Sequence, residues 1–228
     1  FMRGLDSEGN WRTPFNPRAS NHRNDDYCEG TAWQWTWFVP HDVDGLVELM
    51  GGRDAFIGKL DSLFTADSKL EGESTSVDIS GLIGQYAHGN EPSHHIAHLY
   101  NYVGQPWRTQ EIVDEVLHTL YFNNPDGLSG NEDCGQMSAW YILNAMGFYQ
   151  VCPGKPVYSI GRPLFNEATV HLKDGKSFKV IAHNNSRDNK YVRSIVLNGN
   201  KLETPFFTHQ DIVDGGTLEL TMGSEPLK

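Results

Sequence analysis

The pattern of hydrophobic and polar positions changes its period near residue 155. Before that point, apolar residues recur at helical spacing in "HDVDGLVELMGGRDAFIGKLDSLF", where Gly51-Gly52 separates two amphipathic helices and predicts a helical hairpin. The same spacing predicts further helices in "SHHIAHLYNYV", "TQEIVDEVLHTLYF" and "GQMSAWYILNAMGFY", the last of which ends at Gly147. This half of the chain is predicted to be all-helical.

After Pro153 the pattern favours strands. The short β-rich runs "TVHL", "SFKVIAH", "YVRSIVL" and "TLELTM" alternate with the turn dipeptides Asp174-Gly175, Asn198-Gly199 and Gly215-Gly216. Short strands at such spacing are typical of an antiparallel β-sandwich. We therefore expect a mixed architecture of two parts, a helical domain over residues 1–155 and an antiparallel β-sandwich-like segment over residues 156–228.

Composition narrows the classes of partner. With 228 residues, of which 38% are hydrophobic and 21% charged, the chain is long enough to build real cores. A net charge of −11 and the lack of a continuous basic run argue against nucleic acid as a partner. No apolar run approaches the roughly 18 residues of a membrane span, and no targeting signal stands at the start of this sequence. We expect neither a nucleic-acid nor a membrane partner.

The cysteines exclude some classes of protein, and the aromatic residues favour a sugar-binding site. Cys28, Cys134 and Cys152 are an odd number without CxxC spacing, which argues against a disulfide scaffold and a zinc ribbon. Six Trp, nine Tyr and eleven Phe are more informative, because several of them stand beside carboxylates. A flat apolar ring next to a hydrogen-bonding group suits a sugar, although ordinary core packing also accounts for aromatic side chains.

The first cluster of possible chemistry is "DYCEGTAWQWTWFVPHD". Glu29 is followed by Trp33, Trp35 and Trp37, which alternate with polar residues. A carboxyl flanked by indoles is partly desolvated, and its raised pKa keeps it protonated as a general acid must be. The alternative is a surface acid near a helix N-terminus.

The second cluster is "NEPSHHIAH", from Asn90 to His98. Asn90 and Glu91 offer hard oxygen ligands suited to calcium, whereas His94 and His95 suit either hydrogen bonds to hydroxyls or softer metals. Zinc is disfavoured, because the sequence has no HExxH motif and no Cys–His pairing at the usual spacing.

The third cluster is "NNPDGLSGNEDCGQMSAWY", where Asn131, Glu132 and Asp133 stand just before a predicted helix. An isolated Asp here would be read as a helix cap. However, Glu29, Glu91 and Asp133 each precede a helix and each border aromatic residues. Because helix-initiating loops gather at one end of a helical barrel, we expect these three loops to meet in one cleft.

Four stretches carry a resemblance to a known family: "DYCEGTAWQWTWFVPHDVDGLVELMGG", "HGNEPSHHIAHLYNYVGQPWRTQ", "GLSGNEDCGQMSAWYILNAMGFYQVCPG" and "YSIGRPLF". In order and spacing they resemble glycoside hydrolase family 92, the calcium-dependent exo-acting α-mannosidases. The resemblance implies an N-terminal β-sandwich followed by an (α/α)6-barrel catalytic domain. This sequence then begins inside the barrel and lacks the N-terminal part of its parent chain. Its helices are too few for twelve, so the resemblance implies an incomplete barrel with an exposed apolar flank.

Residue by residue, the resemblance assigns roles. Glu29, in "YCEG", matches the general acid that protonates the departing oxygen, and Asp133, in "GNEDCGQ", matches the aspartate that activates water. Glu91, in "GNEP", is implied to lie near calcium together with Asn90. The substrate-binding residues implied by the resemblance and the clusters are Trp33, Glu91, His94, His95 and Asn131.

The function implied is removal of terminal α-linked mannose from glycans with inversion, as in N-glycan degradation. Calcium is the implied cofactor, a mannose-containing glycan the substrate, and an α-1,2 linkage its target. The parent would be periplasmic or secreted, and the fragment alone inactive. Two alternatives stay open. One is a non-catalytic carbohydrate-binding or structural fragment. The other is an (α/α)6 phosphorylase or glucosidase, for which the sequence offers neither a glycine-rich phosphate cradle nor an Arg cluster.

Overall fold

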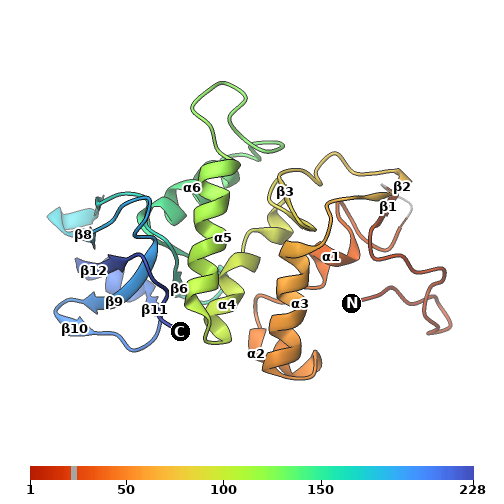
Figure 1. Ribbon diagram of the computed structural model, residues 1–228, viewed down its shortest axis with the longest axis horizontal. Coiled ribbons are helices and arrows are strands. Elements are labelled where there is room, and N and C mark those ends of the chain that lie inside the picture. Colours follow the sequence, from red (N-terminus) through yellow and green to blue (C-terminus); the bar gives the residue numbers. More distant parts are fainter. Residues whose placement is uncertain (22–24) are drawn as a thin grey trace. The chain divides into compact units, whose positions relative to one another are not determined.

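The computed structural model describes residues 1–21 and 25–228 of the chain. Most of the helices come before residue 147 and most of the longer strands after it (Figure 1). The described residues form two compact units, Phe1–His94 with Phe122–Met137, and His95–Tyr121 with Ser138–Lys228. This division differs from the boundary expected near residue 155, because the helices between residues 95 and 121 belong with the strands. None of the helices described is long and apolar enough to cross a bilayer.

The first unit contains the predicted helical hairpin. Asp42 caps its first helix by accepting from the Gly45 N–H, and the positive φ of Gly51 and Gly52 (97° and 96°) ends that helix before the second begins. The helices and strands of this unit, in chain order, are β1 (Ala19–Asn21), α1 (Ala32–Trp35), α2 (Val43–Leu49), α3 (Arg53–Thr65), β2 (Glu71–Ser74), β3 (Leu82–Ile83), β4 (Tyr86–Ala87) and the 3₁₀ turn η1 (Glu91–Ser93).

The core of the first unit lies along α3. Trp37 is fully buried and meets Phe56 edge-on with ring centroids 5.3 Å apart, and Phe64 packs on Tyr86 at 5.2 Å. Gln34, on α1, donates from its side chain to the Gln85 carbonyl oxygen at 2.5 Å. This hydrogen bond joins α1 to the residue directly before β4.

The second unit combines helices with two sheets. Its elements are η2 (Ile96–His98), α4 (Leu99–Tyr102), α5 (Pro106–Thr119), most of α6 (Gln136–Met146), β5 (Phe148–Tyr149), β6 (Val157–Ile160), β7 (Glu167–His171), η3 (Lys173–Gly175), β8 (Ser177–His183), β9 (Tyr191–Leu197), β10 (Asn200–Lys201), β11 (Phe206–Thr208), α7 (His209–Val213) and β12 (Gly216–Gly223).

The segment "SHHIAHLYNYV" departs from the continuous helix expected for it. It forms η1, η2 and the four-residue α4 instead, with i→i+3 bonds from His94 N to Glu91 O and from His98 N to His95 O. The tighter turns bury the His94, His95 and His98 side chains on the inside of the chain. Hydrogen bonds of the imidazoles, which a periodicity argument does not consider, favour this geometry; His98 bonds Ser159 Oγ at 3.0 Å and Asn144 Oδ1 at 2.9 Å.

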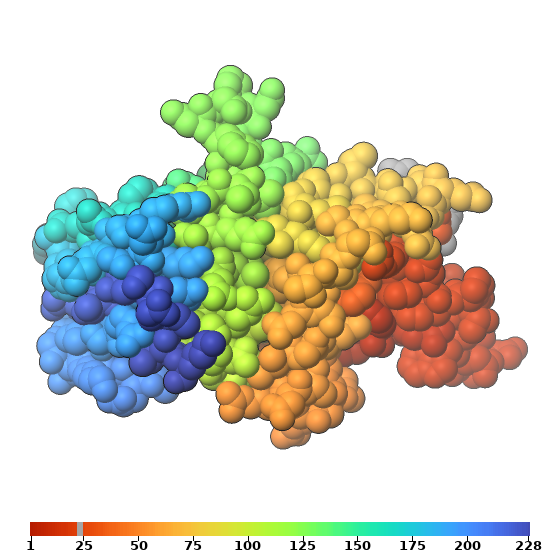
Figure 2. Space-filling view, viewed as in Figure 1, coloured from red at the N-terminus to blue at the C-terminus, as the bar shows by residue number. Residues whose placement is uncertain are grey.

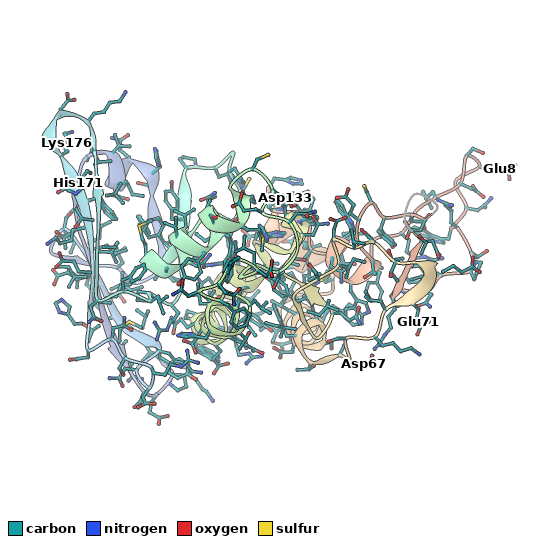
Figure 3. All side chains as sticks on the ribbon, turned by 90° about the horizontal axis from the view of Figure 1, so that it is seen from above. Glu8, Asp67, Glu71, Asp133, His171 and Lys176 are labelled. Atoms are coloured by element: carbon teal, nitrogen blue, oxygen red, sulfur yellow. The ribbon has the colours of Figure 1, made fainter. Side chains whose placement is uncertain are left out.

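The sheets confirm the β-rich tail and correct its topology. The five-stranded sheet has the order β10-β9-β12-β8-β7, and the three-stranded sheet the order β11-β6-β5. Most neighbours are antiparallel, as expected, but β12 runs parallel to β8. The predicted turns at Asp174-Gly175 and Asn198-Gly199 join hairpins, and both residues of each dipeptide have positive φ. Figure 3 labels His171 and Lys176 beside the first of these turns.

The two sheets share one hydrophobic core. Alternate residues of β8 and β12 are buried and meet the three-stranded sheet, where Phe178 stacks on Phe207 with centroids 5.9 Å apart. The space-filling view shows the surface of the C-terminal strands in blue shades (Figure 2). The sandwich-like arrangement is therefore present, whereas the described helices do not form an (α/α)6 barrel by themselves.

We predict that Phe178→Ala destabilises the second unit by about 3–5 kcal/mol, because it removes a fully buried ring from this core. Thermal and denaturant unfolding of the protein carrying this chain would measure the loss. Lys173→Ala, at an exposed position of the nearby turn, is the matched control and should change stability by less than about 0.5 kcal/mol. Equal losses in the two variants would contradict the assignment of this core.

Candidate active site

The Glu29 loop has a strained backbone. Glu29 adopts φ = 50°, in the left-handed region that non-glycine residues rarely enter, and its side chain is exposed. Two residues later Thr31 begins α1 with a capping box, in which its side chain accepts from the Trp33 N–H and pairs with Gln34. The acid therefore precedes a helix, as expected.

The enclosure of Glu29 by indoles is not found. Trp37 is buried against Phe56, and Trp35 donates from Nε1 to the Cys28 carbonyl oxygen at 2.7 Å. Trp33, expected to bind substrate, meets Phe1 edge-on at 5.0 Å and the Lys59 ammonium at 4.2 Å. Each indole has contacts of its own, and the Glu29 side chain remains exposed among the described residues.

The Asn90 loop is tied directly to the Glu29 loop. Asn90 is buried, and its side-chain Nδ2 donates to the Glu29 carbonyl oxygen at 2.8 Å. Its Oδ1 accepts from the Glu91 N–H at 3.1 Å and caps η1. Asn90 is thus a connector between two loops, while the half-buried Glu91 carboxylate accepts no hydrogen bond from the residues that the structure describes.

The loops of "GNEP" and "GNED" pack on each other through their glycines. A Cβ built on Gly130 would lie 2.7 Å from Ser80 Oγ and 3.2 Å from the Gly89 carbonyl oxygen, and a Cβ on Gly89 would overlap Ser80 Oγ outright. Only glycine permits this approach. It sets Asn90-Glu91 and Asn131-Glu132 beside each other, with the Ser80 hydroxyl between.

Asp133 stands at the start of a left-handed turn on the loop that leads into α6 (Figure 3). Asp133, Cys134 and Gly135 have φ values of 53°, 56° and 101° in succession. For a non-glycine residue this conformation costs roughly 1–2 kcal/mol. Glu132 compensates, since its carboxylate accepts from the Gly135 N–H. The left-handed turn leaves the Asp133 side chain exposed to solvent.

The electrostatics of Asp133 suit a base. Partial desolvation, and then the negative charges of Glu91, Asp78 and Glu132, raise the pKa of Asp133 above its ordinary value, while the His94 imidazole lowers it. A carboxylate with a raised pKa holds an abstracted proton better. Glu91 has the largest effect of these charges, which is consistent with the contact between the loops that carry the two acids.

Behind Asp133 lies a chain of buried polar groups. Burial lowers the pKa of His94 to about 4, so the ring is neutral near pH 7. Its Nε2 donates to the His88 carbonyl oxygen at 3.0 Å, so Nδ1 accepts from Gln136 Nε2, also at 3.0 Å. The Tyr86 hydroxyl bonds His88 Nδ1 at 2.8 Å. His94 therefore supports the site, with both ring nitrogens engaged within the chain.

The remaining residues predicted to bind substrate are His95 and Asn131. His95 is buried and is the first residue of the second unit. Asn131 is exposed and donates from Nδ2 to Asp78 Oδ1 at a long 3.5 Å. Substrate binding by His95 and Asn131 stays a prediction.

Three contributors were missed by the sequence analysis. Asp78, fixed by the Ser76 hydroxyl at 2.9 Å, and Ser80 lie on the irregular segment after β2, which carries no motif. Gln136 stands inside the quoted stretch "GNEDCGQ". Its position three residues after Asp133, in the first turn of the helix, could have identified it as a residue of the site. No comparable signal points to Asp78.

The described residues do not make a calcium site on their own. Their carboxylate oxygens have the right chemistry, and Ca²⁺ takes six to eight such ligands. However, no three His, Cys, Asp or Glu side chains of the described chain are arranged to hold an ion. The oxygen of Asn90 already caps η1, which leaves Glu91 as the better placed of the two predicted ligands.

Glycoside hydrolases use a pair of carboxyl groups, and carboxyl-bearing loops lie beside one another here. The profile of the glycosyl hydrolase family 92 catalytic domain matches residues 1–224, so the chain belongs to glycosyl hydrolase family 92.

Known proteins are similar over the whole chain. A family 92 α-mannosidase from Bacteroides thetaiotaomicron, solved in complex with mannoimidazole, is 43% identical with a TM-score of 0.92; the match covers 100% of this chain and 30% of that one. An inverting family 92 mannosidase from Bacteroides thetaiotaomicron VPI-5482 is also 43% identical, with a TM-score of 0.85, over 99% of this chain and 31% of that one.

A curated relative comes from Arthroderma benhamiae (strain ATCC MYA-4681 / CBS 112371). It is described as an uncharacterized secreted glycosidase and is 32% identical over 200 residues, which are 86% of this chain and 24% of the relative. The chain thus spans about a quarter to a third of the length of these relatives.

We predict that Asp78→Asn lowers the pKa of Asp133 toward its ordinary value, because it removes one of the negative charges that raise it. A ¹³C titration of the Asp133 carboxyl would show the shift, and the charged form of Asp133 would then persist to lower pH. The exposed Asp126, on the same loop, provides the control variant Asp126→Asn. An unchanged titration in Asp78→Asn would contradict the coupling.

Proposed function

We propose that this chain carries the two catalytic carboxyls of an inverting, exo-acting α-mannosidase, with Glu29 as general acid and Asp133 as general base. The observation that carries the proposal is the meeting of the Glu29, Asn90 and Asp133 loops in one unit of a family 92 chain. The raised pKa of Asp133 supports its role as the base. The α-mannosidases of similar structure support mannose as the sugar.

The proposed reaction is a single displacement. Asp133 takes a proton from water, the water oxygen attacks the anomeric carbon, and the glycosidic bond breaks as Glu29 gives its proton to the departing oxygen. Inverting enzymes keep the two carboxyls about 6.5–9.5 Å apart to admit that water. Both side chains are exposed, so water and sugar can reach them.

The substrate proposed is the terminal α-linked mannose of a glycan, with an α-1,2 linkage, as in N-glycan breakdown. The whole protein is proposed to act outside the cytoplasm, which the secreted curated relative supports. The chain alone is proposed to have negligible activity, because the described residues leave the acid uncovered and offer no complete metal site.

The family assignment favours catalysis over the alternative of a non-catalytic carbohydrate-binding or structural fragment. That alternative gives Glu29 and Asp133 capping roles only. It requires that their replacement leave hydrolysis by the whole protein unchanged.

We predict that Asp133→Asn in the whole protein abolishes turnover of every α-mannoside, because water must always be activated. Glu29→Gln should cost on the order of 10²–10⁴-fold with poor leaving groups and spare an activated aryl mannoside in part. Proton NMR of the reaction should show β-mannose released first, the signature of inversion. Initial release of α-mannose, or full activity of Asp133→Asn, would sink the assignment.

A calcium requirement is proposed for the whole protein, with Glu91 as the ligand from this chain and the other oxygens from outside the described residues. When bound, calcium would hold sugar hydroxyls.

We predict that exhaustive chelation abolishes mannoside hydrolysis and lowers the melting temperature of the whole protein, and that calcium restores both better than zinc because the ligands are oxygens. Glu91→Gln should weaken the restoring effect of calcium, while Glu48→Gln, at an exposed position in α2, serves as the control. Unaltered hydrolysis and melting after chelation would exclude the requirement.

A further inference from the structure

The position of Asp133 depends on its backbone. Among the described residues, no hydrogen bond reaches its carboxylate, and the side chain is exposed. The left-handed turn of Asp133, Cys134 and Gly135 sets the direction of its Cα–Cβ bond. Backbone in sparsely populated conformations persists only where the surroundings enforce it. The groups that enforce this turn therefore also place the carboxylate.

One such group lies on the N-terminal side of the turn. The Glu132 carboxylate accepts from the Gly135 N–H, which closes a ring around Asp133 and Cys134. The Glu132 carbonyl oxygen accepts from the Met137 N–H at 3.2 Å, and that of Asp133 from the Gln136 N–H at 3.1 Å. These bonds join the turn to the first residues of α6.

The second group lies on the C-terminal side. Gln136 donates from Nε2 to His94 Nδ1 at 3.0 Å, and His94 in turn is anchored to the His88 carbonyl oxygen. His94 and His88 are 2% and 0% exposed, so this anchor is part of the rigid interior of the first unit. The end of the turn is thereby attached to a buried point.

We propose that Glu132 and Gln136 are positioning residues, which clamp the left-handed turn at its two ends and so hold Asp133 in the orientation of a base. The inference rests on the proposed function of Asp133. Neither residue has to touch the sugar for this role. A plain helix-stabilising role, in which Glu132 only favours the N-terminus of α6, would give a different result in the kinetics.

The test uses the whole protein and an aryl α-mannoside, with kcat and KM measured separately. Glu132→Ala and Gln136→Leu should lower kcat by about 10- to 100-fold, because a displaced base misses the water, and leave KM within about twofold. Glu132→Gln keeps an oxygen that accepts from the Gly135 N–H, so it should retain kcat within about threefold at a pH where Asp133 is ionised. Asp126→Ala, an exposed acid of the same loop, is the control.

Hydrogen exchange at the Gly135 amide gives a second measurement that does not depend on catalysis. The amide should be protected in the wild type and in Glu132→Gln, and should exchange fast in Glu132→Ala. The inference is overturned if Glu132→Ala keeps the wild-type kcat, if Glu132→Gln falls as far as Glu132→Ala, or if the Gly135 amide exchanges equally in all three.

The two proposals fail in different ways. If Asp133→Asn remains fully active, the proposed function is wrong, and the proposal that Glu132 and Gln136 position a base is then wrong as well. If Asp133→Asn is inactive while Glu132→Ala and Gln136→Leu match the wild type, the proposed function stands and only the clamp is refuted.

Discussion

The close approach of two glycines is the constraint on which the site depends. Gly89 and Gly130 pack against each other and against Ser80 at distances that no Cβ could share. Because they stand directly before Asn90-Glu91 and Asn131-Glu132, the contact puts two carboxyl-bearing loops together. The Asn90 bond to the Glu29 carbonyl oxygen then adds the third loop. A loop cluster of this kind needs little regular structure, which agrees with the short strands β3 and β4 around it.

Much of the fold was accessible from the sequence, because periodicity and turn chemistry are local signals. The hairpin of α2 and α3, the helices α5 and α6 and the turns at Asp174-Gly175 and Asn198-Gly199 lie where they were predicted. The parallel pairing of β12 with β8 was not predicted, since alternation along a strand carries no information about the direction of its neighbour. The 3₁₀ turns near His94 were also missed, because buried imidazole bonds overrode helical spacing.

For the site, the motifs located the loops that carry the acids, but they did not predict which residues surround each acid. Glu29, Glu91 and Asp133 do lie on neighbouring loops, as the sequence indicated. The Glu29 side chain is exposed among the described residues, and the Trp35 indole bonds the backbone of Cys28 beside it. Asp78 acts on Asp133 through space from a segment some fifty residues away; such an electrostatic partner has no signature in sequence. The assigned roles of Trp33, His95 and Asn131 in binding stay predictions.

The parallel pairing of β12 has a consequence for how the chain is made. In the order β10-β9-β12-β8-β7 the last strand of the described chain is the middle one. Until β12 leaves the ribosome, β8 and β9 have no common neighbour, and each exposes an unpaired edge and an apolar face meant for the shared core. The hairpins on either side can form early, but the sheet closes only after β12 has been synthesised. Nascent chains of this protein therefore carry two incomplete sheets with aggregation-prone edges. The yield of folded protein should depend on chaperones that shield such edges.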